Sequence, residues 1–212
     1  MRVAMNNTPG RRRDTVIFDL GGVLIDWDPR YLYRRLFNGD EAAVEHFLAN
    51  VCTGEWNRQQ DAGRPFAEAE AEAAGRHPDK LELIQAWARN FHEMIPSAID
   101  GTVAILDELR RRRVPLYALT NWSAETFAIQ PSRFEFLAWF DGIVVSGQEK
   151  LIKPDARIFQ VLLDRYGIDP ARAVFIDDVA ANAAAGAALG IHPIHFTGPD
   201  QLRRELKVLS LL

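Results

Sequence analysis

Five short apolar segments recur along the chain, and each is bounded by Gly, Pro, Asn or Asp. Their richness in Val, Ile, Phe and Tyr is typical of strands that are buried on both faces. The segments cover residues 15–20, 115–121, 142–147, 173–178 and 192–196. Helical patterns lie between the later segments, at 100–113, 154–167 and 179–190. Strands that alternate with helices predict an α/β protein with a doubly wound parallel sheet.

The stretch 28–95 breaks this alternation because it holds amphipathic helical pieces and no convincing strand. We therefore expect a helical cap at 28–95, inserted into a core formed by residues 14–27 and 96–212. Residues 1–13 are polar and are expected to form a flexible tail.

Composition narrows the class of protein. The 212 residues are 48% hydrophobic and carry a net charge of −4, which fits a globular protein and argues against a nucleic-acid partner. No apolar run reaches the length of a signal peptide or a membrane span. The lone Cys52 has no partner for an intrachain disulfide, which favours a reducing, cytoplasmic location. We expect no membrane partner, and the chain could be a monomer or a homodimer.

Polar residues stand at the ends of the predicted strands. Asp19 ends the first, Thr120 and Asn121 end the second, and Asp177 and Asp178 end the fourth. Because ligands of open parallel sheets bind at the carboxyl ends of the strands, we expect these side chains to meet at one edge.

The formal charges of these residues predict which cations lie at that edge. Three clustered carboxylates carry about −3, and Lys153, in a Lys-Pro-Asp sequence before a predicted helix, supplies +1. A divalent cation would balance the remainder, and oxygen ligands without Cys or His favour Mg²⁺. Phosphoryl transfer is the chemistry that such a site suits, and an aspartate can attack phosphorus to give an aspartyl-phosphate.

Four short motifs in chain order resemble those of the haloacid dehalogenase superfamily. They are FDLGGVL around Asp19, LTN at 119–121, KPD at Lys153 and FIDD at 175–178. The resemblance covers residues 14 to 200 and implies a Rossmann-like core with a helical cap. Within the superfamily, the chain is similar to glucose-1-phosphate phosphatase and to the phosphatase domain of epoxide hydrolases.

The resemblance also implies roles for individual residues. Asp19 would be the nucleophile and a metal ligand, and Lys153 would neutralise it. Metal would also be held by Asp178, by the Gly21 carbonyl, and by Asp177 directly or through water. Thr120, Asn121 and the Gly22 amide would hold the phosphoryl oxygens.

One position departs from the pattern. Phosphatases of this superfamily usually carry a second aspartate two residues after the nucleophile, where this chain has Gly21. That aspartate acts as general acid and base, a contribution of roughly 100- to 10,000-fold. Asp26 is the first candidate to replace it, and Glu55 and Asp61 of the cap are the next.

Three functions remain open on these residues. The first is a Mg²⁺-dependent phosphatase for a small phosphorylated metabolite, with a sugar phosphate favoured. The second is a metal-independent 2-haloacid dehalogenase, which needs no acid because halide leaves unprotonated. The third is a non-catalytic binding protein of the same fold.

The polar cap segment 53–66 is the expected source of substrate specificity. Trp56 is the candidate for substrate contact, together with Asn57, Gln59 and Asp61, although Trp56 could instead pack inside the cap. Trp122, next to Asn121, could also line the pocket.

Overall fold

The structure is a computed structural model that describes residues 13–212. Of the tail expected for residues 1–13, all but Arg13 therefore lies outside the described residues. A five-stranded parallel sheet with the order β3-β2-β1-β4-β5 forms the centre of the protein. The strands are β1 (Thr15–Phe18), β2 (Leu116–Thr120), β3 (Gly142–Val145), β4 (Ala173–Asp177) and β5 (His192–His195). Each lies within a segment that the apolar pattern predicts, which confirms the doubly wound α/β fold.

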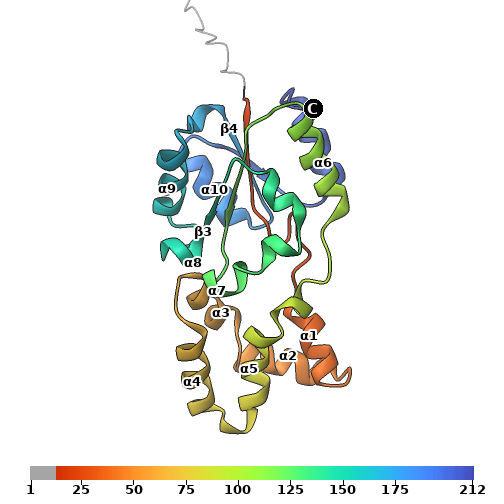
Figure 1. Ribbon diagram of the computed structural model, residues 1–212, viewed down its shortest axis with the longest axis vertical. Helices are drawn as coiled ribbons and strands as arrows, with labels where there is room; N and C mark the ends of the chain where they lie inside the picture. The colour runs from red at the N-terminus through yellow and green to blue at the C-terminus, as the bar shows by residue number, and fades with distance from the viewer. Residues whose placement is uncertain (1–12) are drawn as a thin grey trace, which may run out of the picture.

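Helices cover both faces of the sheet (Figure 1). α6 (Asp100–Arg111) and α11 (Pro199–Val208) contact each other on one face, and α9 (Ala156–Tyr166) and α10 (Ala180–Ala188) lie on the other. Successive strand residues point to opposite faces, so Val16 and Phe18 pack with the α6 side and Ile17 packs with the α9 side. The sheet is therefore buried on both faces, as continuous apolar strands require.

Short helices connect these parts of the core. They are α7 (Ala124–Phe127), η3 (Gln130–Ser132), η4 (Glu135–Trp139), α8 (Ser146–Glu149) and η5 (Pro170–Arg172). Ser123 caps α7 by accepting a hydrogen bond from the Glu125 N–H at 3.2 Å, in agreement with its place before that helix in the sequence.

The chain between β1 and α6 is helical and gathers at one end of the sheet (Figure 1). It contains α1 (Pro29–Leu36), α2 (Glu41–Asn50), α3 (Gly54–Asp61), α4 (Phe66–Arg76), η1 (Pro78–Lys80), α5 (Leu81–Arg89) and η2 (Phe91–Met94). We call this segment the cap. Its interior is aromatic: Tyr33 packs against Phe47 and Trp87, with ring centroids 4.7 and 6.0 Å away. Cys52 is buried there, and burial raises the pKa of its thiol to about 12, which disfavours the reactive thiolate.

Helix α3 brings one end of the cap to the sheet. Thr53 starts it by accepting a hydrogen bond from the Trp56 N–H at 3.0 Å. The helix ends at Asp61, and Gly63, with φ +97°, turns the chain close to the backbone of α8. Ser146 Oγ of α8 then donates to the Asp61 carbonyl at 2.6 Å. The C-terminal end of α3 is thereby attached to the core beside the carboxyl ends of the strands.

Among the described residues, no helix is long and apolar enough to cross a membrane.

Candidate active site

Asp19 stands directly after the central strand β1. Its backbone N–H donates to the Ile176 carbonyl at 2.8 Å, which extends the pairing of β1 with β4 by one residue. One carboxylate oxygen, Oδ1, accepts from the Leu20 N–H at 2.7 Å and contacts Lys153 Nζ at 2.9 Å. Both contacts fix the carboxylate through Oδ1, which leaves Oδ2 to attack an electrophile.

Lys153 is fully buried, and its ammonium group has three acceptors. Nζ donates to the Leu119 carbonyl at 2.8 Å and lies 2.7 Å from Asp177 Oδ2 and 2.9 Å from Asp19 Oδ1. Burial alone would lower the pKa of Lys153, but the two carboxylates outweigh it and raise the pKa. Lys153 is thus held as a cation at the carboxyl ends of β1, β2 and β4.

One lysine does not neutralise this cluster. Burial raises the pKa of Asp19 to about 7 in spite of Lys153, and the Asp177 and Asp178 charges add to the rise. Burial also raises the pKa of Asp178. A further positive charge at this position would stabilise the ionised carboxylates.

The donor set fits a hard divalent cation. Carboxylate oxygens of Asp19, Asp177 and Asp178 lie within 4.8 Å of one another, a spacing at which they could surround one ion. Asp178 is exposed toward the cavity, so it has room for an ion.

Asp177 is less available than the sequence suggests. It is fully buried, and its carboxylate accepts from Lys153 Nζ, from the Val179 N–H at 2.8 Å, and from Asn182 Nδ2 at 3.1 and 3.2 Å. Direct coordination of a metal by Asp177 would compete with these donors. Its contacts instead suit a residue that holds Lys153 in place, with any metal contact made through water.

Gly22 lies against Asp178 in a left-handed conformation, with φ +73°. A Cβ at this position would meet Asp178 Oδ2 at 2.3 Å, so a larger residue would have to push this carboxylate aside and would also strain the left-handed backbone. If the cluster holds Mg²⁺ as the sequence predicts, Gly22→Ala will displace Asp178 and weaken Mg²⁺ binding by about 10- to 100-fold, the usual cost of disturbing the surroundings of a metal ligand. Isothermal titration with Mg²⁺ measures this change.

Gly21 provides the matched control, because a Cβ there meets no described atom within 4 Å. Gly21→Ala leaves the backbone carbonyl in place, so any Mg²⁺ binding that the wild type shows is expected to be unchanged in this variant. Equal weakening in both variants would contradict the steric explanation for Gly22.

The residues predicted to hold phosphate divide into two groups. Thr120 ends β2 and lines the cavity, as expected. The Asn121 side chain, by contrast, pairs with the Lys153 backbone: Nδ2 donates to the Lys153 carbonyl at 3.0 Å, and Oδ1 accepts from its N–H at 2.8 Å. Asn121 therefore positions the lysine loop, and a phosphate contact would fall to its backbone amide.

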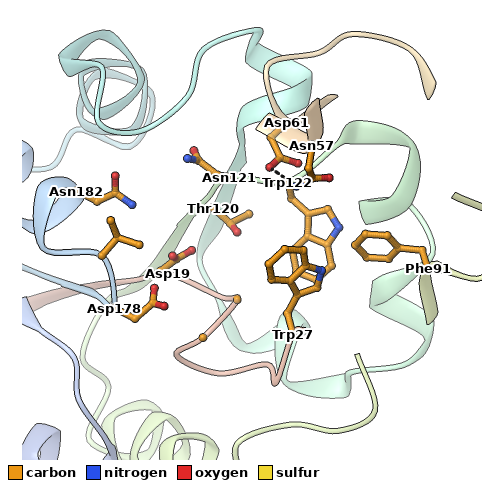
Figure 2. A pocket seen from close by; sticks show the side chains of 13 residues that line it. Asp19, Trp27, Asn57, Asp61, Phe91, Thr120, Asn121, Trp122, Asp178 and Asn182 are labelled. Atoms are coloured by element: carbon orange, nitrogen blue, oxygen red, sulfur yellow. Dashed lines mark hydrogen bonds between the residues drawn. The ribbon is translucent and has the colours of Figure 1, made fainter. Parts of the chain in front are cut away.

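A cavity of about 240 Å³ opens at this edge of the sheet. Figure 2 shows Asp19 and Asp178 together on one side and Asp61 with Asn57 on the other, beyond Thr120 and Asn121. The lining consists of Asp19, Gly21, Gly22, Trp27, Asn57, Asp61, Phe91, Thr120, Asn121, Trp122, Asp178, Val179 and Asn182. The carboxylate cluster thus faces a pocket shared by the core and the cap, and Trp122 lines it as the sequence allowed.

Four candidates from the sequence lie elsewhere, among them Gln59, which is exposed and outside the cavity lining. Asp26 is outside the lining, and its Oδ2 accepts a hydrogen bond from the Tyr31 hydroxyl at 2.9 Å on the surface. Glu55 is exposed on α3, away from the cavity. Trp56 is 4% exposed; it packs against Trp87 at 5.3 Å and donates from Nε1 to the Ala69 carbonyl. The structure corrects the prediction that Trp56 contacts the substrate, because this side chain belongs to the cap interior.

Sequence reasoning missed four residues of the lining: Trp27, Phe91, Val179 and Asn182. The sequence does contain a signal for Asn182, because it is the single polar residue in the alanine-rich helix α10 and lies five positions after Asp177. Trp27 and Phe91 stand at the two ends of the helical insert, and only the folded cap brings them to the pocket.

Comparisons with known proteins find related sequences along most of the chain. A family described as haloacid dehalogenase-like hydrolase matches residues 13–190. The chain is 28% identical to mouse acyl-CoA dehydrogenase family member 10 over 94% of its own length, but it spans 19% of that protein. It is also 26% identical to the sesquiterpene phosphatase astK of Aspergillus oryzae, over 91% of this chain and 94% of the relative.

Solved structures show the same fold at low identity. A family enzyme from Bacteroides thetaiotaomicron, in complex with magnesium and inorganic phosphate, superposes with a TM-score of 0.66 at 24% identity, over 88% of this chain and 95% of that one. An L-2-haloacid dehalogenase superposes with a TM-score of 0.68 at 18% identity, over 93% and 99% of the two chains.

Proposed function

The chain belongs to the haloacid dehalogenase-like hydrolases, and we propose that it is a Mg²⁺-dependent phosphatase that acts on a small phosphorylated metabolite. The observation that carries the proposal is Lys153, whose ammonium group lies between Asp19 and Asp177 while Asp178 faces the same cavity. Such a cluster costs stability unless a ligand uses its charges, because buried like charges repel each other. A phosphate ester with a divalent cation is the ligand that balances them.

In this proposal, Asp19 Oδ2 attacks the phosphorus atom and forms an aspartyl-phosphate. Lys153 contacts Asp19 Oδ1 at 2.9 Å, so it orients the nucleophile and offsets the charge of the transferring group. Thr120 and the backbone amides of Asn121 and Gly22 supply donors for the phosphoryl oxygens. Asp19, Asp178 and the Gly21 carbonyl are the groups that would hold Mg²⁺, which would supply additional charge neutralisation at the phosphoryl group.

The finer proposal concerns the substrate. Trp27, Phe91 and Trp122 provide apolar surfaces in the pocket, whereas Asn57 and Asp61 provide hydrogen-bonding groups. A pocket of this type binds a compact carbon skeleton and fixes it by a few polar contacts. A sugar or polyol phosphate fits these requirements, with hydroxyl groups toward Asn57 and Asp61 and the carbon skeleton against the aromatic side chains.

A dehalogenase is the second candidate, and the loss of the usual acid at Gly21 favours it. The test uses the purified full chain with p-nitrophenyl phosphate, a panel of sugar and prenyl phosphates, and 2-chloropropionate. We expect phosphate release that requires Mg²⁺ and stops on addition of EDTA. Chloride release without metal would overturn the phosphatase, and no turnover of any substrate would favour a binding protein. Preference for prenyl over sugar phosphates would overturn only the finer proposal.

A further inference from the structure

The proposed phosphatase needs a proton donor that the loop after Asp19 does not provide. An alkoxide leaving group takes up a proton, and the water that hydrolyses the aspartyl-phosphate must lose one. Gly21 carries no side chain for either transfer. Steric crowding does not explain why glycine stands at this position, because a Cβ at Gly21 meets no described atom within 4 Å. Another group must therefore act, or the substrate must not require it.

Asp61 is the acidic residue of the cavity to which no part of the bond-breaking chemistry has yet been assigned. Among the described residues, three carboxylates line the cavity: Asp19, Asp61 and Asp178. Asp19 is the proposed nucleophile and Asp178 a proposed metal ligand, which leaves Asp61. The Asp61 side chain is half-buried and accepts a hydrogen bond through Oδ2 from Asn57 Nδ2, one helical turn earlier in α3, at 3.1 Å.

The position of Asp61 suits a group that acts on the departing oxygen. In a displacement at phosphorus, the attacking and leaving oxygens lie on opposite sides of the phosphorus atom. Asp61 lies across the cavity from Asp19, with Thr120 and Asn121 between them (Figure 2). A substrate attacked by Asp19 therefore projects its leaving group toward the side of the pocket that Asp61 occupies.

The backbone of Asp61 is fixed to the core. Its carbonyl accepts a hydrogen bond from Ser146 Oγ at 2.6 Å, and the same Oγ accepts from the Trp122 N–H at 2.8 Å. Trp122 follows Asn121 directly, so Asp61 is tied to the segment that ends β2. A cap residue held in this way keeps its place relative to the carboxylate cluster, which proton transfer requires.

We propose that Asp61, a residue of the cap, is the general acid and base that replaces the missing carboxylate at Gly21. The proposal rests on the phosphatase function argued above. In the first step, Asp19 bonds to phosphorus, the bond from phosphorus to the ester oxygen breaks, and that oxygen takes the proton of Asp61. In the second step, water gives a proton to ionised Asp61 and bonds to phosphorus while the bond from phosphorus to Asp19 Oδ2 breaks, which releases inorganic phosphate and restores the Asp19 carboxylate.

The environment of Asp61 supports both steps. Burial raises the pKa of Asp61 to about 7, although the Ser123 backbone amide and the Arg58 charge oppose the rise. Near neutral pH both the acid and the carboxylate are then populated, as alternating donation and acceptance require.

The test compares two leaving groups in Asp61→Asn. p-Nitrophenolate leaves readily without a proton, whereas the alkoxide of a sugar or polyol phosphate does not. We expect kcat for the best alkyl phosphate of the panel to fall about 100-fold or more and kcat for p-nitrophenyl phosphate to fall far less. Glu68→Gln removes an exposed carboxylate of the neighbouring cap helix α4 and serves as the control, with both rates unchanged.

The alternatives give different results. Equal loss on both esters would mean that Asp61 binds substrate or maintains the pocket, which overturns this proposal and leaves the phosphatase intact. A change in KM with kcat unaltered overturns it in the same way. A wild-type protein that releases phosphate from no ester overturns the phosphatase and this proposal together.

A second measurement uses the open space at Gly21. If Asp61 already supplies the proton, Gly21→Asp will raise kcat for the alkyl phosphate more in the Asp61→Asn background than in the wild type. The reason is that the two carboxylates would catalyse the same proton transfers. An equal gain in both backgrounds would show that they act independently and would overturn the proposal.

Discussion

Asp19→Asn is expected to lower kcat for phosphate release by on the order of 10⁴-fold or more, because an amide cannot form the covalent intermediate. The substitution keeps the shape of the side chain, which the Leu20 N–H fixes through Oδ1 at 2.7 Å. Initial rates of phosphate release with saturating Mg²⁺, for the wild type and the variant, measure the effect.

A stability measurement separates this loss from unfolding. Burial raises the pKa of Asp19 to about 7, so its charged form is unfavourable in the folded state. Lys153 keeps its ion pair with Asp177 at 2.7 Å when Asp19 is replaced by a neutral amide, so the melting temperature is expected to stay the same or rise. Asp164→Asn, on the exposed surface of α9, is the control that should change neither quantity. Residual turnover in Asp19→Asn near the wild-type rate would show that another group attacks the phosphorus.

The sheet could be predicted because the sequence signals of each strand lie within or directly beside that strand. Each strand is a continuous apolar run with breaking residues at both ends, and the polar residue at each carboxyl end stands next to its strand in the sequence. Asp19, Thr120, Lys153 and Asp178 follow from that placement together with the rule that ligands bind at the carboxyl ends of parallel strands. The structure brings all four to one edge.

The cap side of the pocket could not be predicted in the same way, because tertiary packing decides which cap side chains line the cavity. Trp56 and Asp61 lie in one short helix, yet Trp56 turns into the cap and Asp61 faces the cavity. Asp26 is close to the nucleophile in sequence but bonds to Tyr31 on the surface. The sequence ranked Asp26 above Asp61 because Asp26 ends the loop after the nucleophile and similar phosphatases carry an acid there, whereas the folded chain places Asp61, and not Asp26, at the cavity.

Lys153→Met is expected to lower the free energy of unfolding by about 3–5 kcal/mol, the range found when one partner of a buried ion pair is removed. The ammonium group makes three contacts, at 2.7 to 2.9 Å, and two of its acceptors are carboxylates. Methionine fills the space of the alkyl chain but leaves Asp19 and Asp177 facing each other without a cation. Urea unfolding monitored by circular dichroism gives the change, with Lys207→Met on the surface of α11 as the control.

The same variant separates stability from catalysis when it is combined with Asp177→Asn. Removing the Asp177 charge relieves part of the repulsion, so the double variant is expected to be more stable than Lys153→Met alone, which a double-mutant cycle quantifies. Phosphate release should stay low in both variants, because neither restores the cation beside the Asp19 nucleophile. Recovery of activity together with stability would mean that Lys153 serves the fold alone, and the charge balance proposed for the reaction would then have to come from another group.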